Sequence, residues 1–123
     1  MLLIQKSFKK RRHVMLFISL IMASVSTFAH VHLASATPYA NSFLNQQPQK
    51  ITLHFSSDVV LTNVKLLNEE GHDIKLNHAF NHDLKKTFHI AVPHLNSGRY
   101  IVRLSIAEKG GHDMHSEYSF SVR

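Results

Sequence analysis

An alternation of apolar and polar residues, with a period of two, limits this chain to strands over most of its length after residue 50. The alternation recurs in five segments: residues 51–56, 63–66, 87–92, 100–106 and 118–123. A strand with one buried and one solvated face produces this period, whereas an amphipathic helix produces a period of 3.6. No segment after the first thirty residues carries a helical pattern over ten positions. We therefore expect an all-β domain.

Turn-forming residues separate the predicted strands, at positions 68–71, 93–98 and 110–111. The polar stretch 38–48 is expected to be a surface connection. Without helices to cover a sheet, the strands must cover one another, which predicts a β-sandwich or a small barrel. Tyr100 stands at the start of a strand directly after a turn. This position is compatible with a Greek-key sandwich in which the tyrosine hydroxyl bonds back to the turn.

The first 29 residues have the three parts of a secretory signal. A basic start leads into an uncharged apolar run at residues 14–23, and small residues follow up to Ala29. The apolar run is too short to cross a bilayer comfortably, because a spanning helix needs roughly 20 apolar residues. We therefore predict cleavage after Ala29, in preference to an uncleaved membrane anchor. The predicted organisation is a signal peptide at 1–29 and one exported domain at 30–123, which is not embedded in the membrane.

The positive charge of the chain belongs mainly to the predicted signal. Of the 14 Lys and Arg residues, five lie in the first 29 residues, which contain none of the 8 acidic residues. Removal of 29 of the 123 residues leaves 94, with 9 basic and 8 acidic side chains, so nucleic acid is not an expected partner. The chain has no cysteine, which excludes disulfides and thiolate metal sites. Histidine is abundant instead, and 10 of the 11 histidines follow the predicted cut.

Two histidines lie at the start of the predicted mature chain, where His30 would be the first residue and His32 the third. A terminal histidine offers its free amine and its imidazole, and Cu(II) prefers such nitrogen-rich coordination. Alternatively, the amine, two backbone amides and the third-position imidazole could enclose Cu(II) in a square plane. The two modes compete for the same amine, and the sequence leaves both open, together with adventitious binding by a frayed terminus.

A second group of metal-binding side chains follows the glycine pair at 110–111. His112, Asp113 and His115 could stand on one side of this turn as ligands. A solvated hairpin without a metal would have the same composition. This turn is therefore a candidate metal site, to be judged by the other ligands that the fold brings beside it.

The remaining histidines receive simpler interpretations. His54 and His89 fall on the polar side of their strands and are expected to face solvent. Residues 78–83 contain two histidines and an aspartate, which form a weaker candidate patch that zinc would also accept.

Five segments match one pattern in order and spacing: residues 30–38 (HVHLASATP), 51–56 (ITLHFS), 95–100 (LNSGRY), 111–112 (GH) and 118–122 (YSFSV). With these segments, the predicted mature chain resembles the CopC-type periplasmic copper resistance proteins over essentially its whole length. The resemblance implies a seven-stranded, immunoglobulin-like β-sandwich in the periplasm. It also implies a Cu(II) site formed by His30 and His112, in a family that holds or carries copper and is not known for catalysis.

The chain departs from the family pattern at two acidic positions. The family commonly has an aspartate two residues before the turn histidine, where this chain has Gly110, and a glutamate where this chain has Ser57. A site with fewer carboxylates should bind copper more weakly or use substitutes. We expect His32, Asp113 or His115 to serve as such substitutes.

The leading hypothesis is a periplasmic Cu(II)-binding protein without enzymatic activity, which acts as a copper buffer or carrier in copper tolerance. Its partners would be the copper ion and another periplasmic or membrane copper-handling protein. Met114 is the only methionine after the predicted cut, which excludes a Cu(I) site of several thioethers. One alternative is an oxidative copper enzyme that uses the N-terminal histidine, although the chain has no tryptophan for a glycan platform. The other is an immunoglobulin-like interaction module with incidental histidines.

Overall fold

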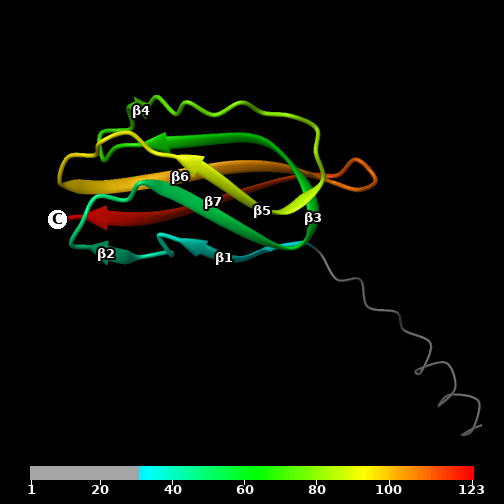
Figure 1. The fold of residues 1–123 in the computed structure, drawn as a ribbon, viewed down its shortest axis with the longest axis horizontal. Helices are drawn as coiled ribbons and strands as arrows, with labels where there is room; N and C mark the ends of the chain where they lie inside the picture. Colours follow the sequence, from blue (N-terminus) through cyan, green and yellow to red (C-terminus); the bar gives the residue numbers. More distant parts are fainter. Residues whose placement is uncertain (1–30) are drawn as a thin grey trace, which may run out of the picture. The chain divides into compact units, whose positions relative to one another are not determined.

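The structure is a computed structural model that describes residues 31–123. The predicted signal peptide and His30 lie outside the described residues. In the described range the chain forms seven strands and no helix (Figure 1): β1 (Leu33–Thr37), β2 (Ser42–Leu44), β3 (Lys50–Leu67), β4 (Asp73–Ile74), β5 (Lys85–Ala91), β6 (Gly98–Glu108) and β7 (Asp113–Val122). The all-β fold class predicted from the alternation is confirmed.

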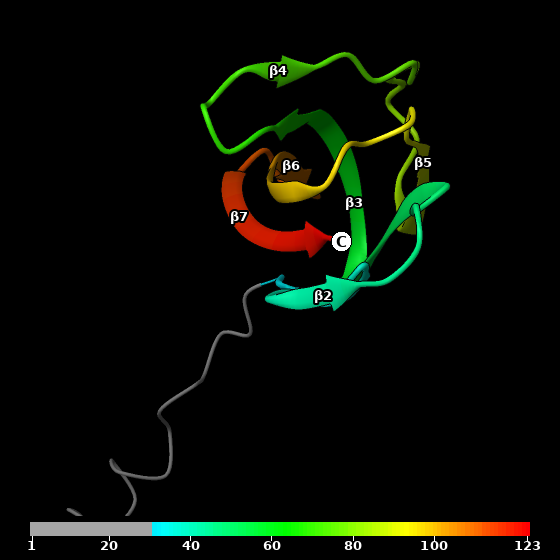
Figure 2. The same cartoon turned by 90° about the vertical axis from the view of Figure 1, so that its left-hand side faces the viewer.

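All seven strands belong to one hydrogen-bonded sheet, whose main path runs β1-β3-β6-β7-β2. β4 and β5 also pair with β3. The ladder between β2 and β7 is parallel, and the others are antiparallel. Figure 2 shows the strands curving around a common interior, with β3 bent along its length. The sandwich therefore arises from one sheet whose faces curl over a single core.

β3 is 18 residues long and connects the two parts of this sheet. Its first half pairs with β1 and β5, and its second half pairs with β6 and β4. The register with β5 shifts between His54 and Val59, and the register with β6 shifts between Leu61 and Asn63. Irregularities of this kind bend a strand. The sequence predicted two strands, at 51–56 and 63–66, because the alternation is interrupted where the single strand bends and changes partners.

The segment 38–48, expected to be a surface connection, contains the short strand β2. Its three residues pair in parallel with the last residues of β7, with Ser42 opposite Phe120 and Leu44 opposite Val122. A three-residue strand is too short to show an alternation, so the pattern gave no sign of it.

Most of the core consists of the inward-facing residues of the alternating segments, and Val59, Leu61, Leu67 and Leu95 complete it. Ile51 and Leu53 are fully buried, and Phe55 is 1% exposed, while His54 between them is exposed. Phe55 packs edge-on against Phe88, with ring centroids 5.9 Å apart. Full burial of an aliphatic or aromatic side chain of this size contributes about 1.5–3 kcal/mol. Buried and exposed side chains therefore alternate along the strand with the predicted period of two.

Two tyrosines contribute to this core in different ways. Tyr100 is 5% exposed, and its hydroxyl donates a hydrogen bond to the backbone oxygen of Asn96 at 2.7 Å. The predicted bond from this tyrosine back to the preceding turn is therefore confirmed. The hydroxyl of Tyr118 is buried without a hydrogen-bond partner among residues 31–123. Its burial raises the pKa of Tyr118 well above the usual value of 10.

Candidate metal centre

The hairpin between β6 and β7 presents His112. The backbone N–H of Gly111 donates to the Glu108 oxygen at 3.0 Å, and the N–H of Glu108 donates to the His112 oxygen at 2.9 Å. Gly110 and Gly111 have φ angles of 112° and 91°, a region that residues with a Cβ rarely adopt. The glycine pair is therefore what allows the tight turn, and the turn leaves the His112 side chain exposed.

His32 lies at the start of β1, where its backbone continues the pairing with β3. Its N–H donates to the Ser56 hydroxyl oxygen at 3.0 Å, and its carbonyl oxygen accepts from the Ser56 N–H at 2.9 Å. The His32 side chain is exposed. The two backbone bonds fix the path of the chain at this point.

Glu108 connects the beginning of the described chain with the hairpin. One of its carboxylate oxygens, Oε1, accepts a hydrogen bond from the backbone N–H of Val31 at 3.3 Å, in a partly buried position. The two residues are 77 positions apart in the sequence. Because the backbone of Glu108 is bonded to that of His112, the contact brings Val31 to the base of the turn that carries His112. Figure 1 shows the start of β1 and the turn after β6 at the same end of the domain.

Sequence reasoning missed Glu108. It closes the apolar alternation of β6 and stands four positions before His112, so the only available signal was an acidic residue at the base of a predicted turn. Its bond to Val31 is a tertiary contact, which no local pattern reveals. Glu108 therefore adds a carboxylate at the base of the hairpin, besides the exposed Asp113.

Asp113 and His115 begin β7 and belong to the ladder with β6. Asp113 is exposed and lies opposite Ala107, and His115 lies opposite Ser105. The Nδ1 atom of His115 is 2.8 Å from the Ser105 hydroxyl oxygen. His115 is therefore held over the outer face of β6, along the strand from the turn that carries His112.

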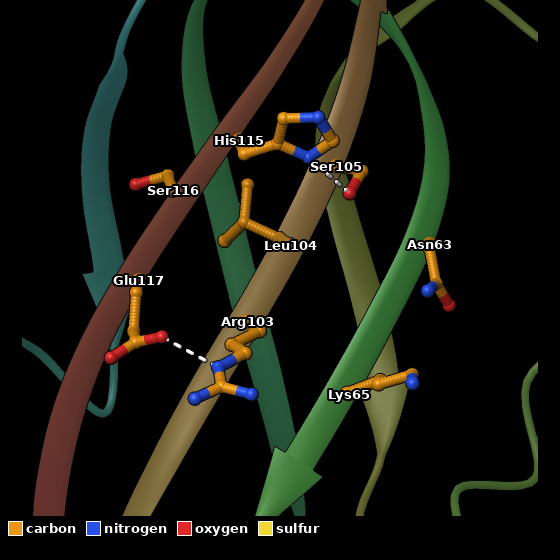
Figure 3. Close-up of a pocket in the computed structure, with 8 residues that line it drawn as sticks. All are labelled: Asn63, Lys65, Arg103, Leu104, Ser105, His115, Ser116 and Glu117. Carbon is orange, nitrogen blue, oxygen red and sulfur yellow. Dashed lines mark hydrogen bonds and ion pairs between the residues drawn. The ribbon is translucent and has the colours of Figure 1, made fainter.

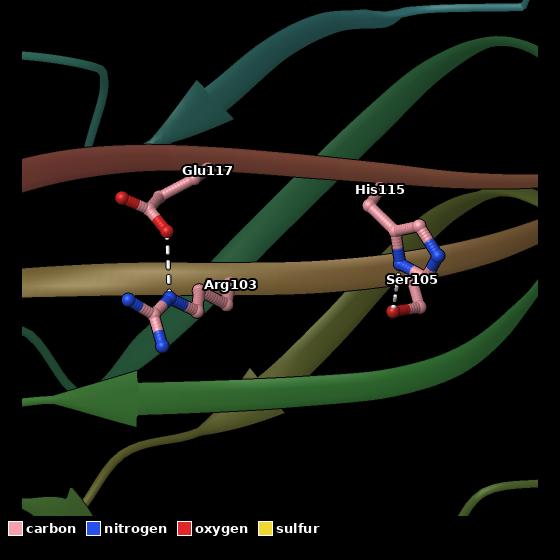
Figure 4. Close-up of polar contacts among 4 residues, drawn as sticks. All are labelled: Arg103, Ser105, His115 and Glu117. Atoms are coloured by element: carbon pink, nitrogen blue, oxygen red, sulfur yellow. Dashed lines mark hydrogen bonds and ion pairs between the residues drawn. The ribbon is translucent and has the colours of Figure 1, made fainter.

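His115 lines an open cavity of about 380 Å³ on that outer face (Figure 3). Figure 4 shows two cross-strand pairs along β6 and β7: His115 with Ser105, and Arg103 with Glu117. The Nε of Arg103 is 2.6 Å from a Glu117 carboxylate oxygen, and both side chains are more than half exposed. An exposed ion pair of this kind contributes at most about 1 kcal/mol. The polar side chains on this face are thus paired with each other across the strands. They do not form a metal-binding cluster.

Within residues 31–123, no group of three or more His, Asp or Glu side chains is arranged to hold a metal ion. The weaker candidate patch at 78–83 is therefore not a three-ligand site, and one of its histidines, His78, instead packs against the ring of Phe80 at 4.9 Å between centroids. His32, His112, Asp113 and His115 do not form a cluster by themselves. The predicted ligand His30 lies outside the described residues, so its position relative to His112 is not described.

Comparison with known proteins identifies the family of this chain. The CopC domain matches residues 33–123, which is most of the chain, and the chain belongs to the CopC family. The resemblance found in the sequence is thereby confirmed. In the part of the chain that the structure describes, no helix is long and apolar enough to cross a membrane.

Three known proteins are similar to this chain. Protein YobA of Escherichia coli strain K12 is 28% identical over 116 residues, which are 91% of this chain and 94% of that protein. PcoC, a methionine-rich copper resistance protein from Escherichia coli, is 28% identical, with a TM-score of 0.61 over 77% of this chain and 100% of PcoC. CopC from Methylosinus trichosporium OB3b has a TM-score of 0.65 over 76% of this chain and 93% of that one, at 23% identity, and supports the fold.

Proposed function

We propose that the processed chain is a periplasmic Cu(II)-binding protein that buffers or carries copper and has no enzymatic activity. Membership of the CopC family supports a role with copper, as does the likeness to PcoC, a copper resistance protein. The observation that carries the proposal is the bond between the Val31 amide and Glu108. It holds the start of the domain at the hairpin that carries His112.

The proposed ligands are nitrogen atoms of His30, which precedes Val31, and of His112, on the hairpin that begins at Glu108. Cleavage after Ala29 would leave His30 as the single residue before Val31. The amine and imidazole of His30 would supply two ligands and His112 a third, a set that suits Cu(II) better than the other divalent metals. Glu108 would supply negative charge near the metal.

The described contacts also favour one of the two binding modes that the sequence left open. The square-planar mode requires Cu(II) to displace the amide protons of the second and third residues, here Val31 and His32. Both amides donate hydrogen bonds, to Glu108 at 3.3 Å and to Ser56 at 3.0 Å. Loss of the two protons would break both bonds and detach the start of β1. The mode with the His30 amine and imidazole leaves both bonds in place.

The test is Cu(II) affinity, measured by chelator competition on protein that begins at His30 and on protein with one additional glycine before it. The glycine moves the amine away from the His30 imidazole and leaves residues 31–123 unchanged. We expect at least a tenfold loss of affinity for the extended protein and for His112→Ala. Equal affinities for the extended and unextended proteins would place the ligands elsewhere and refute the proposal.

A substitution at the third position separates the two binding modes. His32→Gln removes the third-position imidazole and keeps the amine, so we expect it to retain Cu(II) affinity within a few fold. His94→Gln, which changes an exposed loop histidine, is the matched control. If His32→Gln loses as much affinity as the glycine extension, the square-planar mode is the correct one.

A further inference from the structure

Two cross-strand pairs of threonine and histidine lie side by side on the outer face of the β3–β5 ladder. Thr52 is opposite His89, with its hydroxyl oxygen 3.1 Å from the histidine Nδ1. Thr87 is opposite His54, with its hydroxyl oxygen 2.6 Å from the histidine Nδ1. Both histidines are exposed, whereas Leu53, between Thr52 and His54, is fully buried on the opposite face. The solvent-facing positions predicted for the two histidines agree with this arrangement.

The two histidines are diagonal neighbours on this face. Diagonal residues on adjacent strands lie about 7–8 Å apart, and their Cβ atoms are somewhat closer. Each ring reaches a threonine on the opposite strand, so both rings extend over the same gap between β3 and β5. Two imidazole side chains at this diagonal spacing can reach one ion, at the metal–nitrogen distance of about 2 Å that imidazole ligands require.

The threonines leave the other ring nitrogen available for a metal. A hydroxyl oxygen can accept a hydrogen bond from Nδ1–H, and the neutral ring then has its free lone pair on Nε2. A hydrogen bond from the non-coordinating nitrogen fixes the tautomer and the orientation of a metal-binding histidine. Within residues 31–123, the Nε2 atoms of His54 and His89 make no hydrogen bond, and Thr87 and Thr52 hold the two Nδ1 atoms.

We propose that His54 and His89 form a second, exposed Cu(II) site through their Nε2 atoms. The neighbouring positions on β1 are Ser35 and Thr37, so the proposed ligands are two imidazoles and β1 adds no carboxylate. Imidazole nitrogens suit both Cu(II) and Zn²⁺ better than harder ions such as Mg²⁺, and the general affinity order of divalent metals puts Cu(II) above Zn²⁺. With two protein ligands, water fills the remaining coordination positions, so the metal is weakly held and exchanges readily. This site uses only strands β3 and β5 and does not depend on the N-terminal ligands proposed above.

The test is a Cu(II) titration of the processed protein, with calorimetry for the number of bound ions and NMR for the ring protons. We expect two equivalents, the second bound more weakly. The second equivalent should selectively broaden the resonances of His54 and His89 together. His54→Gln and His89→Gln should each weaken the second equivalent by at least tenfold and leave the first unchanged. His94→Gln is the matched control and should retain both equivalents.

These outcomes distinguish the second site from the proposed N-terminal site. Both substitutions are on the exposed face of a sheet, so circular dichroism should confirm an unchanged fold. A single equivalent in the wild-type protein, or a second equivalent that survives either substitution at full affinity, would overturn the proposal. Loss of the first equivalent on glycine extension, with the second retained, would support both sites. Retention of the first equivalent on extension would refute the N-terminal site alone.

Discussion

The same substitution, tyrosine to phenylalanine, should lower stability at Tyr100 but not at Tyr118. Tyr100→Phe removes a hydrogen bond of 2.7 Å from a side chain that is 5% exposed. The net loss for such a bond is about 0.5–1.5 kcal/mol. Tyr118→Phe removes a buried hydroxyl that has no partner among the described residues, so it relieves a desolvation cost of about 1–3 kcal/mol.

Urea unfolding followed by circular dichroism measures both effects, since the chain has no tryptophan to report by fluorescence. We expect Tyr100→Phe to lower the free energy of unfolding by about 1 kcal/mol, which is about 4–8 °C in Tm for a domain of this size. Tyr118→Phe should leave the free energy unchanged or raise it by about 1 kcal/mol. If Tyr118→Phe is as destabilising as Tyr100→Phe, the hydroxyl of Tyr118 has a partner and the reasoning is wrong.

Alkaline pH provides an independent check on Tyr118. Burial raises the pKa of Tyr118 in the folded chain above its unfolded value near 10, so the folded state holds this proton more tightly. The contribution of the protonated hydroxyl to the free energy of unfolding is fully present below pH 10. It declines as the pH rises above 10, by about 1.4 kcal/mol per pH unit. Tyr118→Phe should reduce this decline, whereas Tyr39→Phe, at a side chain that is 68% exposed, should not. Equal slopes in the wild-type protein and Tyr118→Phe would contradict the assignment.

Three further substitutions test the site and the core. Glu108→Ala removes the acceptor for the Val31 amide, so hydrogen exchange at that amide should accelerate. Cu(II) affinity should fall by roughly 10–100-fold. Glu117→Ala is the control and should change neither the exchange nor the affinity. Leu53→Ala, at a fully buried side chain, should cost about 2–5 kcal/mol in urea unfolding, and a loss below 1 kcal/mol would contradict its place in the core. Gly111→Ala places a Cβ at a φ of 91° and should lower stability by about 1–3 kcal/mol in thermal melts. An unchanged stability would show that the turn does not require this φ.

The alternation of apolar and polar residues predicted most of the core, but not Val59, Leu61 and Leu95, which lie outside the alternating segments. Ile51, Leu53, Phe88 and Ile90 are buried at every second position, because a strand alternates its side chains between two faces whatever its partners are. The alternation could not predict the length of β3, since its register shifts interrupt the pattern where the strand bends.

The candidate site was only partly predictable for the same reason. The glycine pair before His112 predicted a turn, because few other residues adopt positive φ, and the structure has the turn there. The contact between Val31 and Glu108 joins residues far apart in sequence and depends on the curl of the whole sheet. His115 looked like a ligand beside His112, yet its partner is Ser105 on the neighbouring strand.

The bent strand β3 has a consequence for how this domain forms. Because β3 pairs with β1 and β5 in its first half and with β6 and β4 in its second, neither half of the sheet can detach without disrupting the other. We expect the domain to unfold in one cooperative transition. Most of these pairings join distant parts of the chain, and all-β folds dominated by such contacts form in milliseconds to seconds. If the chain is exported through the secretory signal that its sequence predicts, slow folding would leave time for translocation before the domain forms.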